Sequence, residues 1–173
     1  MMKKEDYLLV NRESWNNRLE THLNSQFYNM EDFLKGRTSL KKIELDLLGD
    51  VQNKKILHLQ CHFGQDSLSL ARLGATVTGV DLSDNAIEKA TSFAKQLDLK
   101  ATFICADIYS LPTILDEKFD LIFTSYGTIG WLPNLDKWAK IISHYLKPNG
   151  QFVFVEFHPV VWMFDDNFQN ISY

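Results

Sequence analysis

The chain has 173 residues, of which 45% are hydrophobic and 13% aromatic, and this is enough for one domain with a buried core. The net charge of −4 comes without a basic stripe, so we expect no nucleic-acid partner. No run approaches the roughly 18 apolar residues of a membrane span, and no signal sequence follows the N-terminal lysines. Cys61 and Cys105 lack disulfide or zinc spacing. We therefore expect a soluble, cytoplasmic, metal-free protein.

Residues 1–50 predict an N-terminal helical extension. Helical patterns cover residues 12–25 and 39–48. The extension also carries the aromatic residues Trp15, Tyr28 and Phe33. These side chains either form a lid over a ligand or anchor their own helices, and the sequence leaves both alternatives open.

From residue 54 the pattern alternates between strands and helices, and residues 54–157 are expected to form the core. Short apolar or β-branched runs predict parallel strands at 55–60, 76–81, 101–105, 119–125 and 151–157. Helices are predicted near 66–73, 84–97 and 134–146, the last one ending in a turn at 147–150. The alternation predicts a doubly wound α/β fold, with about five mainly parallel strands in the order 3-2-1-4-5 and helices on both faces.

The most informative feature lies at the end of the first two predicted strands. The first strand leads into a loop closed by Gly64, and Asp81 stands 17 residues further on, at the tip of the second strand. In open parallel sheets such a loop approaches a nucleotide-type ligand, and the carboxylate binds ribose hydroxyls. Asp81 has an alternative role as cap of the helix near residue 84, but Ser83 and Asp84 are better placed for it.

Four ordered motifs resemble those of the class I S-adenosylmethionine-dependent methyltransferases. They are Ile56–Gly64, Val77–Ser83, Cys105–Pro112 and Phe119–Gly127, and Leu146–Glu156 resembles the segment that leads into the family's fifth strand. The stretch Leu59–Ala75 further resembles a bacterial subgroup of small-molecule methyltransferases. The resemblance implies S-adenosyl-L-methionine as cofactor and a small-molecule methyl acceptor as partner.

The resemblance also implies where the cofactor binds. The expected cofactor-binding residues are Gln60, Cys61, His62, Phe63, Gly64, Asp81, Leu82, Asp107, Ile108 and Ser125. Asp107 is expected on the adenine side, with a turn-forming aspartate as its alternative role. Leu82 and Ile108 are expected to sandwich the adenine ring, or else to belong to the ordinary core.

The first motif departs from the family pattern at three positions. The family's acid falls at His58, and two of its glycines fall at Gln60 and His62. Glycine is favoured there because it accepts a positive φ and close ligand approach. The loop therefore uses more restricted backbone angles, or it turns its side chains into ligand contacts. We favour the second alternative, with Gln60 and His62 at the amino-carboxylate of the cofactor. For His58 a hydrogen-bonded core histidine is the equal alternative.

The acceptor is expected beyond the carboxyl ends of strands four and five. Ser125, Tyr126, Trp131, Glu156 and His158 project from that region. Methyl transfer depends mainly on holding the reacting groups in line, so we expect no obligatory acid or base. His158, Glu156 and Tyr126 are weak catalytic candidates, the first two as bases for an alcohol or phenol acceptor. The alternatives are a strand-ending turn at His158 and a packing role for Trp131.

Two rival functions remain open at this point. A domain that binds S-adenosylmethionine or another nucleotide without turnover is supported by the lost glycines and the abrupt C-terminus. An NAD-dependent oxidoreductase would share the role of Asp81, but the chain has no Gly-x-Gly-x-x-Gly.

The family resemblance implies two more strands and a helix after strand five, whereas the chain stops at Tyr173. Strand five would then be an apolar edge with unpaired backbone groups. We expect either a truncated form of a longer enzyme, or an edge covered by the tail 158–173 or by a second copy of the chain in a homodimer.

Overall fold

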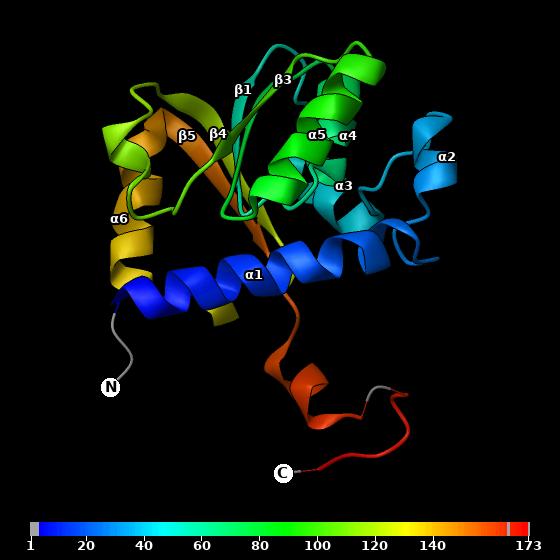
Figure 1. Ribbon diagram of the computed structural model, residues 1–173. Helices are drawn as coiled ribbons and strands as arrows, with labels where there is room; N and C mark the ends of the chain where they lie inside the picture. Colours follow the sequence, from blue (N-terminus) through cyan, green and yellow to red (C-terminus); the bar gives the residue numbers. More distant parts are fainter. Residues whose placement is uncertain (1–3, 166, 173) are drawn as a thin grey trace.

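The computed structural model describes residues 4–165 and 167–172, and at its centre lies one parallel sheet (Figure 1). The strands are β1 (Lys55–Leu59), β2 (Thr76–Asp81), β3 (Ala101–Cys105), β4 (Phe119–Ser125) and β5 (Leu146–Val155). Their order is β3-β2-β1-β4-β5, and every neighbouring pair is parallel. The predicted fold class and strand order are confirmed.

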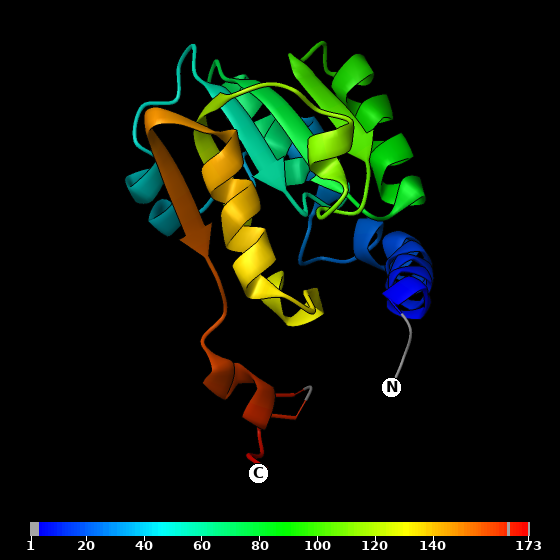
Figure 2. The same ribbon diagram turned by 90° about the vertical axis from the view of Figure 1, so that its left-hand side faces the viewer.

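Helices cover both faces of the sheet (Figure 2). They are α3 (Lys42–Leu48), α4 (Gln65–Arg72), α5 (Asp84–Gln96) and α6 (Leu135–Tyr145). Successive strand residues point to opposite faces, so Ile56 packs into a core cluster with residues of α3 and α4, whereas Leu57 packs into one with α6. The parallel sheet is therefore buried on both sides, and its polar loops gather at the strand ends.

The N-terminal helix α1 (Lys4–Leu23) lies across the carboxyl ends of the strands (Figure 1). Asn16 fixes it to the start of α5, because its side-chain amide donates to Asp84 Oδ1 at 2.8 Å and accepts from Ser83 Oγ at 2.6 Å. On the same side Leu19 is buried in a cluster with Phe93 of α5. These contacts position α1 over the edge where a ligand site is predicted.

The N-terminal helices differ from their predicted bounds. α1 begins at Lys4 instead of residue 12, and its early residues Tyr7 and Asn11 line a cavity, so the helix lacks a clean apolar stripe. A short α2 (Met30–Leu34) was not predicted. α3 begins at Lys42 instead of residue 39, because Ser39 hydrogen-bonds across to α4 in an extended segment.

The turn predicted at 147–150 is wrong, because these residues lie within β5. Leu146 pairs with Phe119, and the register then shifts so that Gln151 pairs with Leu121. The turn-forming residues between them form an irregular stretch in the strand, with Asn149 at a φ of 63°. β5 also ends at Val155 instead of residue 157.

After β5 the chain leaves the sheet as a segment that contains the short helix Pro159–Met163 (Figure 1). No described residue of this segment pairs with β5, so the alternative of an edge covered by the tail is wrong for the residues described; residues 166 and 173 lie outside them. Pairing with a second copy stays a prediction.

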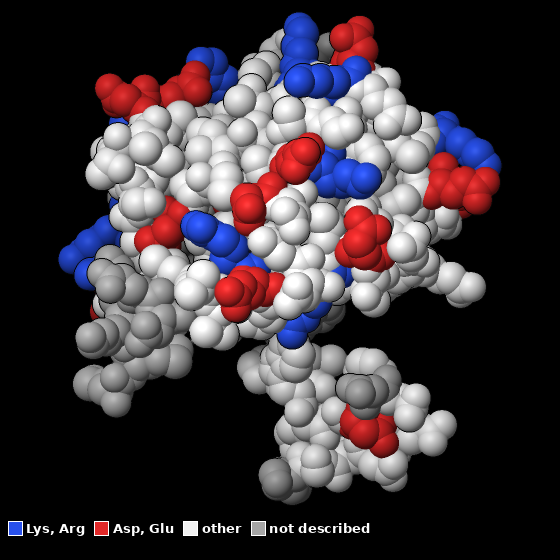
Figure 3. Space-filling model, in the orientation of Figure 1, with Lys and Arg blue, Asp and Glu red and all other residues white. Residues whose placement is uncertain are grey.

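None of the described helices is both long and apolar enough to cross a membrane. On the face seen in Figure 3, acidic and basic side chains are interspersed.

Replacing Gly79 with Ala is expected to lower the free energy of unfolding by about 1–3 kcal/mol. A Cβ at this position would lie 2.6 Å from Cδ1 of Phe103 and 2.9 Å from Sγ of Cys61. Gly130→Ala is the matched control, because its Cβ would meet nothing within 4 Å. Equilibrium denaturation in urea measures both variants. An equal effect in the two would contradict the close packing of β2 against β3.

Candidate functional site

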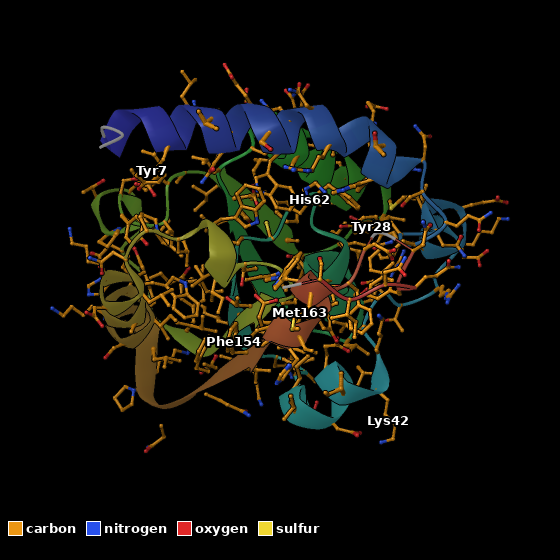
Figure 4. All side chains as sticks on the ribbon, turned by 90° about the horizontal axis from the view of Figure 1, so that it is seen from below. Tyr7, Tyr28, Lys42, His62, Phe154 and Met163 are labelled. Carbon is orange, nitrogen blue, oxygen red and sulfur yellow. The ribbon has the colours of Figure 1, made fainter. Side chains whose placement is uncertain are left out.

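A cavity of about 950 Å³ lies between the N-terminal segment and the carboxyl ends of the strands. Figure 4 looks at this side and shows Tyr7, His62 and Tyr28 near α1. The cavity brings together most of the predicted site residues: His58, Gln60, Cys61, His62, Phe63, Asp81, Leu82, Asp107, Ile108, Ser125 and Tyr126. Gly64, Glu156 and His158 do not line it.

The loop after β1 keeps a left-handed backbone at the three positions where the resemblance implies glycine. The φ angles are 57° at Gln60, 51° at His62 and 76° at Gly64. A residue with a side chain pays about 1–3 kcal/mol for this conformation. The loop therefore has the backbone conformation that glycines would favour, although two of the three residues carry side chains. At Gly64 the space of a Cβ is taken by the ring of Phe103.

Two buried polar atoms of this loop have no hydrogen-bond partner among the described residues: Oε1 of Gln60 and Nδ1 of His62. The amide of Gln60 is oriented by its Nε2, which donates to the carbonyl of Thr128 at 2.9 Å. Burial, together with the nearby His22, lowers the pKa of His62 to about 3, so its ring is neutral at pH 7. Because an unpaired buried polar atom costs about 1–3 kcal/mol, the two atoms mark where a polar ligand fits.

Asp81 stands at the end of β2 with both carboxylate oxygens oriented by backbone groups. Oδ2 accepts the N–H of His62 at 2.7 Å, and Oδ1 accepts that of Ser83 at 2.9 Å. Burial raises the pKa of Asp81, and these hydrogen bonds act in the opposite direction. Each oxygen retains a second acceptor position. The cap of α5 is Ser83, whose Oγ accepts the N–H of Ala86, so Asp81 does not have that alternative role.

Asp107 follows β3 and lines the cavity while it also shapes a turn. Its Oδ1 accepts the N–H of Tyr109 at 3.2 Å. Ile108 is buried in the core cluster that contains Leu111, and it reaches the cavity wall as well. Tyr7 of α1 lines the same cavity, and its buried hydroxyl has no partner among the described residues. Sequence reasoning missed Tyr7, because it lies before the predicted start of the helix.

His58 is a hydrogen-bonded core histidine. Its Nδ1 lies 2.7 Å from Ser67 Oγ, and Nε2 lies 3.5 Å from Ser125 Oγ. Ser125 in turn donates to Oδ2 of Asp66 at 3.0 Å, and Ser39 donates to Oδ1 of the same carboxylate at 2.6 Å. Burial lowers the pKa of His58 to about 3, so the ring is neutral. This network connects β1, β4, α4 and the N-terminal segment beneath the cavity.

The carboxylate of Glu156 is occupied by the loop after β4. It accepts the N–H groups of Gly127, Thr128, Ile129 and Phe157. Burial alone would raise the pKa of Glu156, but these hydrogen bonds outweigh it and lower the pKa. A carboxylate held ionised in this way is a poor proton acceptor, and it stabilises the loop that carries the Thr128 carbonyl.

The other two catalytic candidates also have structural contacts. Nδ1 of His158 accepts the N–H of Val160 at 3.3 Å, which makes His158 the cap of the following short helix. Tyr126 packs against Phe157, with 5.0 Å between ring centroids. Burial and the neighbouring Glu44 raise the pKa of the Tyr126 phenol well above its usual value.

Aromatic side chains of the N-terminal segment close over the loop. Trp15 lies 5.3 Å from Trp131 and 5.2 Å from His62 between ring centroids. Tyr28 packs on Phe63 at 4.9 Å. Trp15, Tyr28 and Trp131 thus line the cavity, whereas Phe33 also belongs to the buried core beneath it. Sequence reasoning also missed the cavity residues Arg18, His22, Lys41, Glu44 and Asp66, whose spacing matches no motif.

Comparison with known proteins shows the family. A family model described as "Methyltransferase domain" matches residues 56–150, more than half of the chain. The chain therefore belongs to this family of methyltransferase domains, and it has the class I fold, whose members use S-adenosylmethionine as methyl donor.

Relatives and solved structures agree with this family. The ubiquinone biosynthesis O-methyltransferase of Coxiella burnetii is 34% identical over 115 residues, which are 66% of this chain and 47% of that protein. An uncharacterised methyltransferase of Synechocystis is 32% identical over 131 residues, covering 75% of this chain and 59% of that protein. The crystal structure of an S-adenosylmethionine-dependent methyltransferase from Mesorhizobium loti has a TM-score of 0.63 at 26% identity, covering 76% and 59% of the two chains. The chain spans about half the length of the Coxiella relative.

Glu156→Gln is expected to lower the free energy of unfolding by about 1–2 kcal/mol at pH 7. The variant loses the charge that strengthens the hydrogen bonds from the backbone N–H groups, and solvent screening of this partly exposed carboxylate limits the loss. The folded state lowers the pKa of Glu156, so this stability is present above the unfolded-state pKa and is lost as the pH falls through the folded one. Urea denaturation at a series of decreasing pH values, from pH 7 until the stability of wild type no longer changes relative to the variant or the protein unfolds, measures it. Glu31→Gln, which removes an exposed charge, is the control. A difference between wild type and Glu156→Gln that persists at low pH would contradict the role of the charge.

Proposed function

We propose that this chain binds S-adenosylmethionine and transfers its methyl group to a small-molecule acceptor. The observation that carries the proposal is Asp81: a carboxylate at the end of β2, oriented by two backbone N–H groups, with acceptor capacity left on both oxygens and a cavity in front of it. That arrangement fits the two hydroxyls of a ribose.

The remaining cavity residues fit the other parts of the cofactor. We assign Asp107 to the adenine edge, and Leu82 and Ile108 to the faces of the ring. The unpaired atoms of Gln60 and His62 fit the zwitterionic end: Oε1 accepts from the ammonium, and an N–H at Nδ1 donates to the carboxylate. One acceptor and one donor, both buried, complement an amino acid better than a second sugar or a nicotinamide.

When bound, S-adenosylmethionine supplies an electrophilic methyl group on a sulfonium sulfur. The protein then has to hold the acceptor in line with that group, and positioning of this kind lowers barriers by up to about 7–11 kcal/mol in favourable models. Glu156 is a hydrogen-bonded anion and the Tyr126 phenol has a raised pKa, so neither is suited to remove a proton. We therefore propose that the residues of this cavity act by binding and orientation.

The acceptor side of the cavity is mainly aromatic. Phe27, Tyr126, Phe157 and Trp162 line it, and the ammonium of Lys41 lies 5.5 Å from the ring centroids of both Phe27 and Tyr126. Such walls suit a small, partly apolar molecule. The Coxiella relative is named for an O-methylation in ubiquinone biosynthesis, and a small hydroxylated acceptor is in keeping with that likeness.

One support for the rival proposal of a domain that binds without turnover was the loss of two glycines. The backbone of the loop is nevertheless left-handed at Gln60 and His62, so these side chains are accommodated without a change from the conformation that glycine would adopt. The lost glycines therefore no longer support the binding domain, and the labelled-methyl experiment separates the two.

Asp81→Asn is expected to weaken binding of S-adenosylhomocysteine by about 2 kcal/mol, roughly 30-fold, because it removes the charge from two hydrogen bonds to ribose. Isothermal titration calorimetry measures the affinity. Asp98→Asn, which makes the same change at the far end of α5, is the control and should bind like wild type. Unchanged affinity in Asp81→Asn would remove the basis of the proposed site.

Methyl transfer itself is tested with S-adenosylmethionine that carries a labelled methyl group and a small-molecule extract. Wild type is expected to label an extractable compound, and Asp81→Asn to do so far more slowly at the same cofactor concentration. Tight binding of the cofactor without any transfer would favour the non-catalytic rival.

His62→Gly is expected to weaken S-adenosylhomocysteine binding by roughly tenfold, although it relieves a strained backbone, because a buried hydrogen bond to the cofactor is lost. Asn53→Gly is the matched control, since Asn53 also has a positive φ, 62°, and lies outside the cavity lining. If affinity rises in His62→Gly, the imidazole is an obstruction, and the proposed contact of this side chain with the cofactor is wrong.

A further inference from the structure

The side chain of His22, in α1, contacts the imidazole of His62 in the loop after β1. Nδ1 of His22 lies 2.9 Å from Nε2 of His62, and the two rings are nearly perpendicular, at 88°. The other ring nitrogen of His62, Nδ1, is buried at the cavity wall and has no partner among the described residues. His62 therefore connects the N-terminal helix to the interior of the proposed cofactor site through its two nitrogens.

The protonation of the two rings is coupled. His62 is neutral, so it carries a single N–H, either on Nε2 or on Nδ1. If His22 accepts the hydrogen bond, the proton of His62 sits on Nε2, and its Nδ1 faces the cavity as an acceptor. If His22 donates, the proton sits on Nδ1 and the cavity receives a donor. The hydrogen-bonding role of His22 thus decides what the cavity presents.

We propose that His22 is a positioning residue that donates from Nδ1 to His62, so that the Nδ1–H of His62 binds the carboxylate of S-adenosylmethionine. This inference rests on the proposed function and goes beyond it, because it makes recognition of the amino-acid end depend on α1. A bound carboxylate requires a donor at Nδ1 of His62, and a His22 that donates to Nε2 fixes the tautomer that carries this donor.

The surroundings of His22 support this role. Its ring packs on Tyr28 with 5.1 Å between centroids, and Ser25 Oγ donates to its backbone carbonyl at 2.8 Å. Burial and the positive charge of Arg18 lower the pKa of His22, so at pH 7 it is neutral. The burial of Tyr28 raises its pKa to about 12, so that side chain is neutral as well. The hydrogen bond between the two histidines is therefore set by tautomers, not by a charge.

Asn and Asp at position 22 separate the role of the donor from packing. The two side chains have the same shape, but the amide of Asn can donate to His62 and the carboxylate of Asp can only accept. The probes are S-adenosylhomocysteine and 5′-methylthioadenosine, which lacks the amino-carboxylate group. We expect His22→Asp to weaken S-adenosylhomocysteine binding by about tenfold or more and to leave 5′-methylthioadenosine affinity unchanged, and His22→Asn to stay within about threefold of wild type for both.

Gln26→Glu controls for charge, because Gln26 lines the same cavity and, among the described residues, makes no hydrogen bond to His62. An equal loss of S-adenosylhomocysteine affinity in this variant and in His22→Asp would overturn the positioning role. So would an equal loss in His22→Asn and His22→Asp, which would indicate packing alone. Thermal melting of each variant checks that α1 stays docked.

Nitrogen-15 NMR of the wild-type histidines gives a direct readout. With S-adenosylhomocysteine bound, His62 is expected as the Nδ1–H tautomer, and an Nε2–H tautomer overturns the inference. Failure of the proposed function looks different: wild type would then bind neither S-adenosylhomocysteine nor 5′-methylthioadenosine, and the inference would fall with it.

Discussion

The hydrogen bond from the backbone N–H of His62 to Asp81 is the contact on which the site depends. At 2.7 Å it ties the loop after β1 to the end of β2, and it leaves the carboxylate facing the cavity. It also holds a residue at positive φ, where the backbone would otherwise relax. Because β1 and β2 are hydrogen-bonded neighbours in the sheet, the strand order itself brings the two ligand-binding elements together.

The second constraint is α1, which turns an open sheet edge into a cavity. Asn16 fixes the helix to α5, Trp15 packs on Trp131, and His22 bonds to His62. These contacts join α1 to three different loops, so the docked position of the helix depends on the conformation of all three. The polar network of His58, Ser125 and Asp66 joins the ends of β1 and β4 beneath two of these loops.

The core of this architecture could be predicted from the sequence, because buried parallel strands are short apolar runs and α5 carries a regular apolar stripe. Asp81 could be predicted for the same reason: it ends one of those runs. The start of α1 could not, since residues such as Tyr7 face a cavity and break the periodicity. β5 was misjudged because Asn149 and its neighbours form a turn-like irregularity inside a strand. The pairing of His22 with His62 joins residues 40 positions apart, which no local pattern encodes.

Strain in the loop gives the site its dependence on the whole fold. Left-handed conformations at Gln60 and His62 cost about 1–3 kcal/mol each. They are offset by one contact to β2, through Asp81, and by one to the loop after β4, through the Thr128 carbonyl. Glu156 in turn holds Thr128 from the end of β5. The geometry of the loop therefore requires β2, β4 and β5 together, and a ligand that binds this geometry must stabilise all three against unfolding.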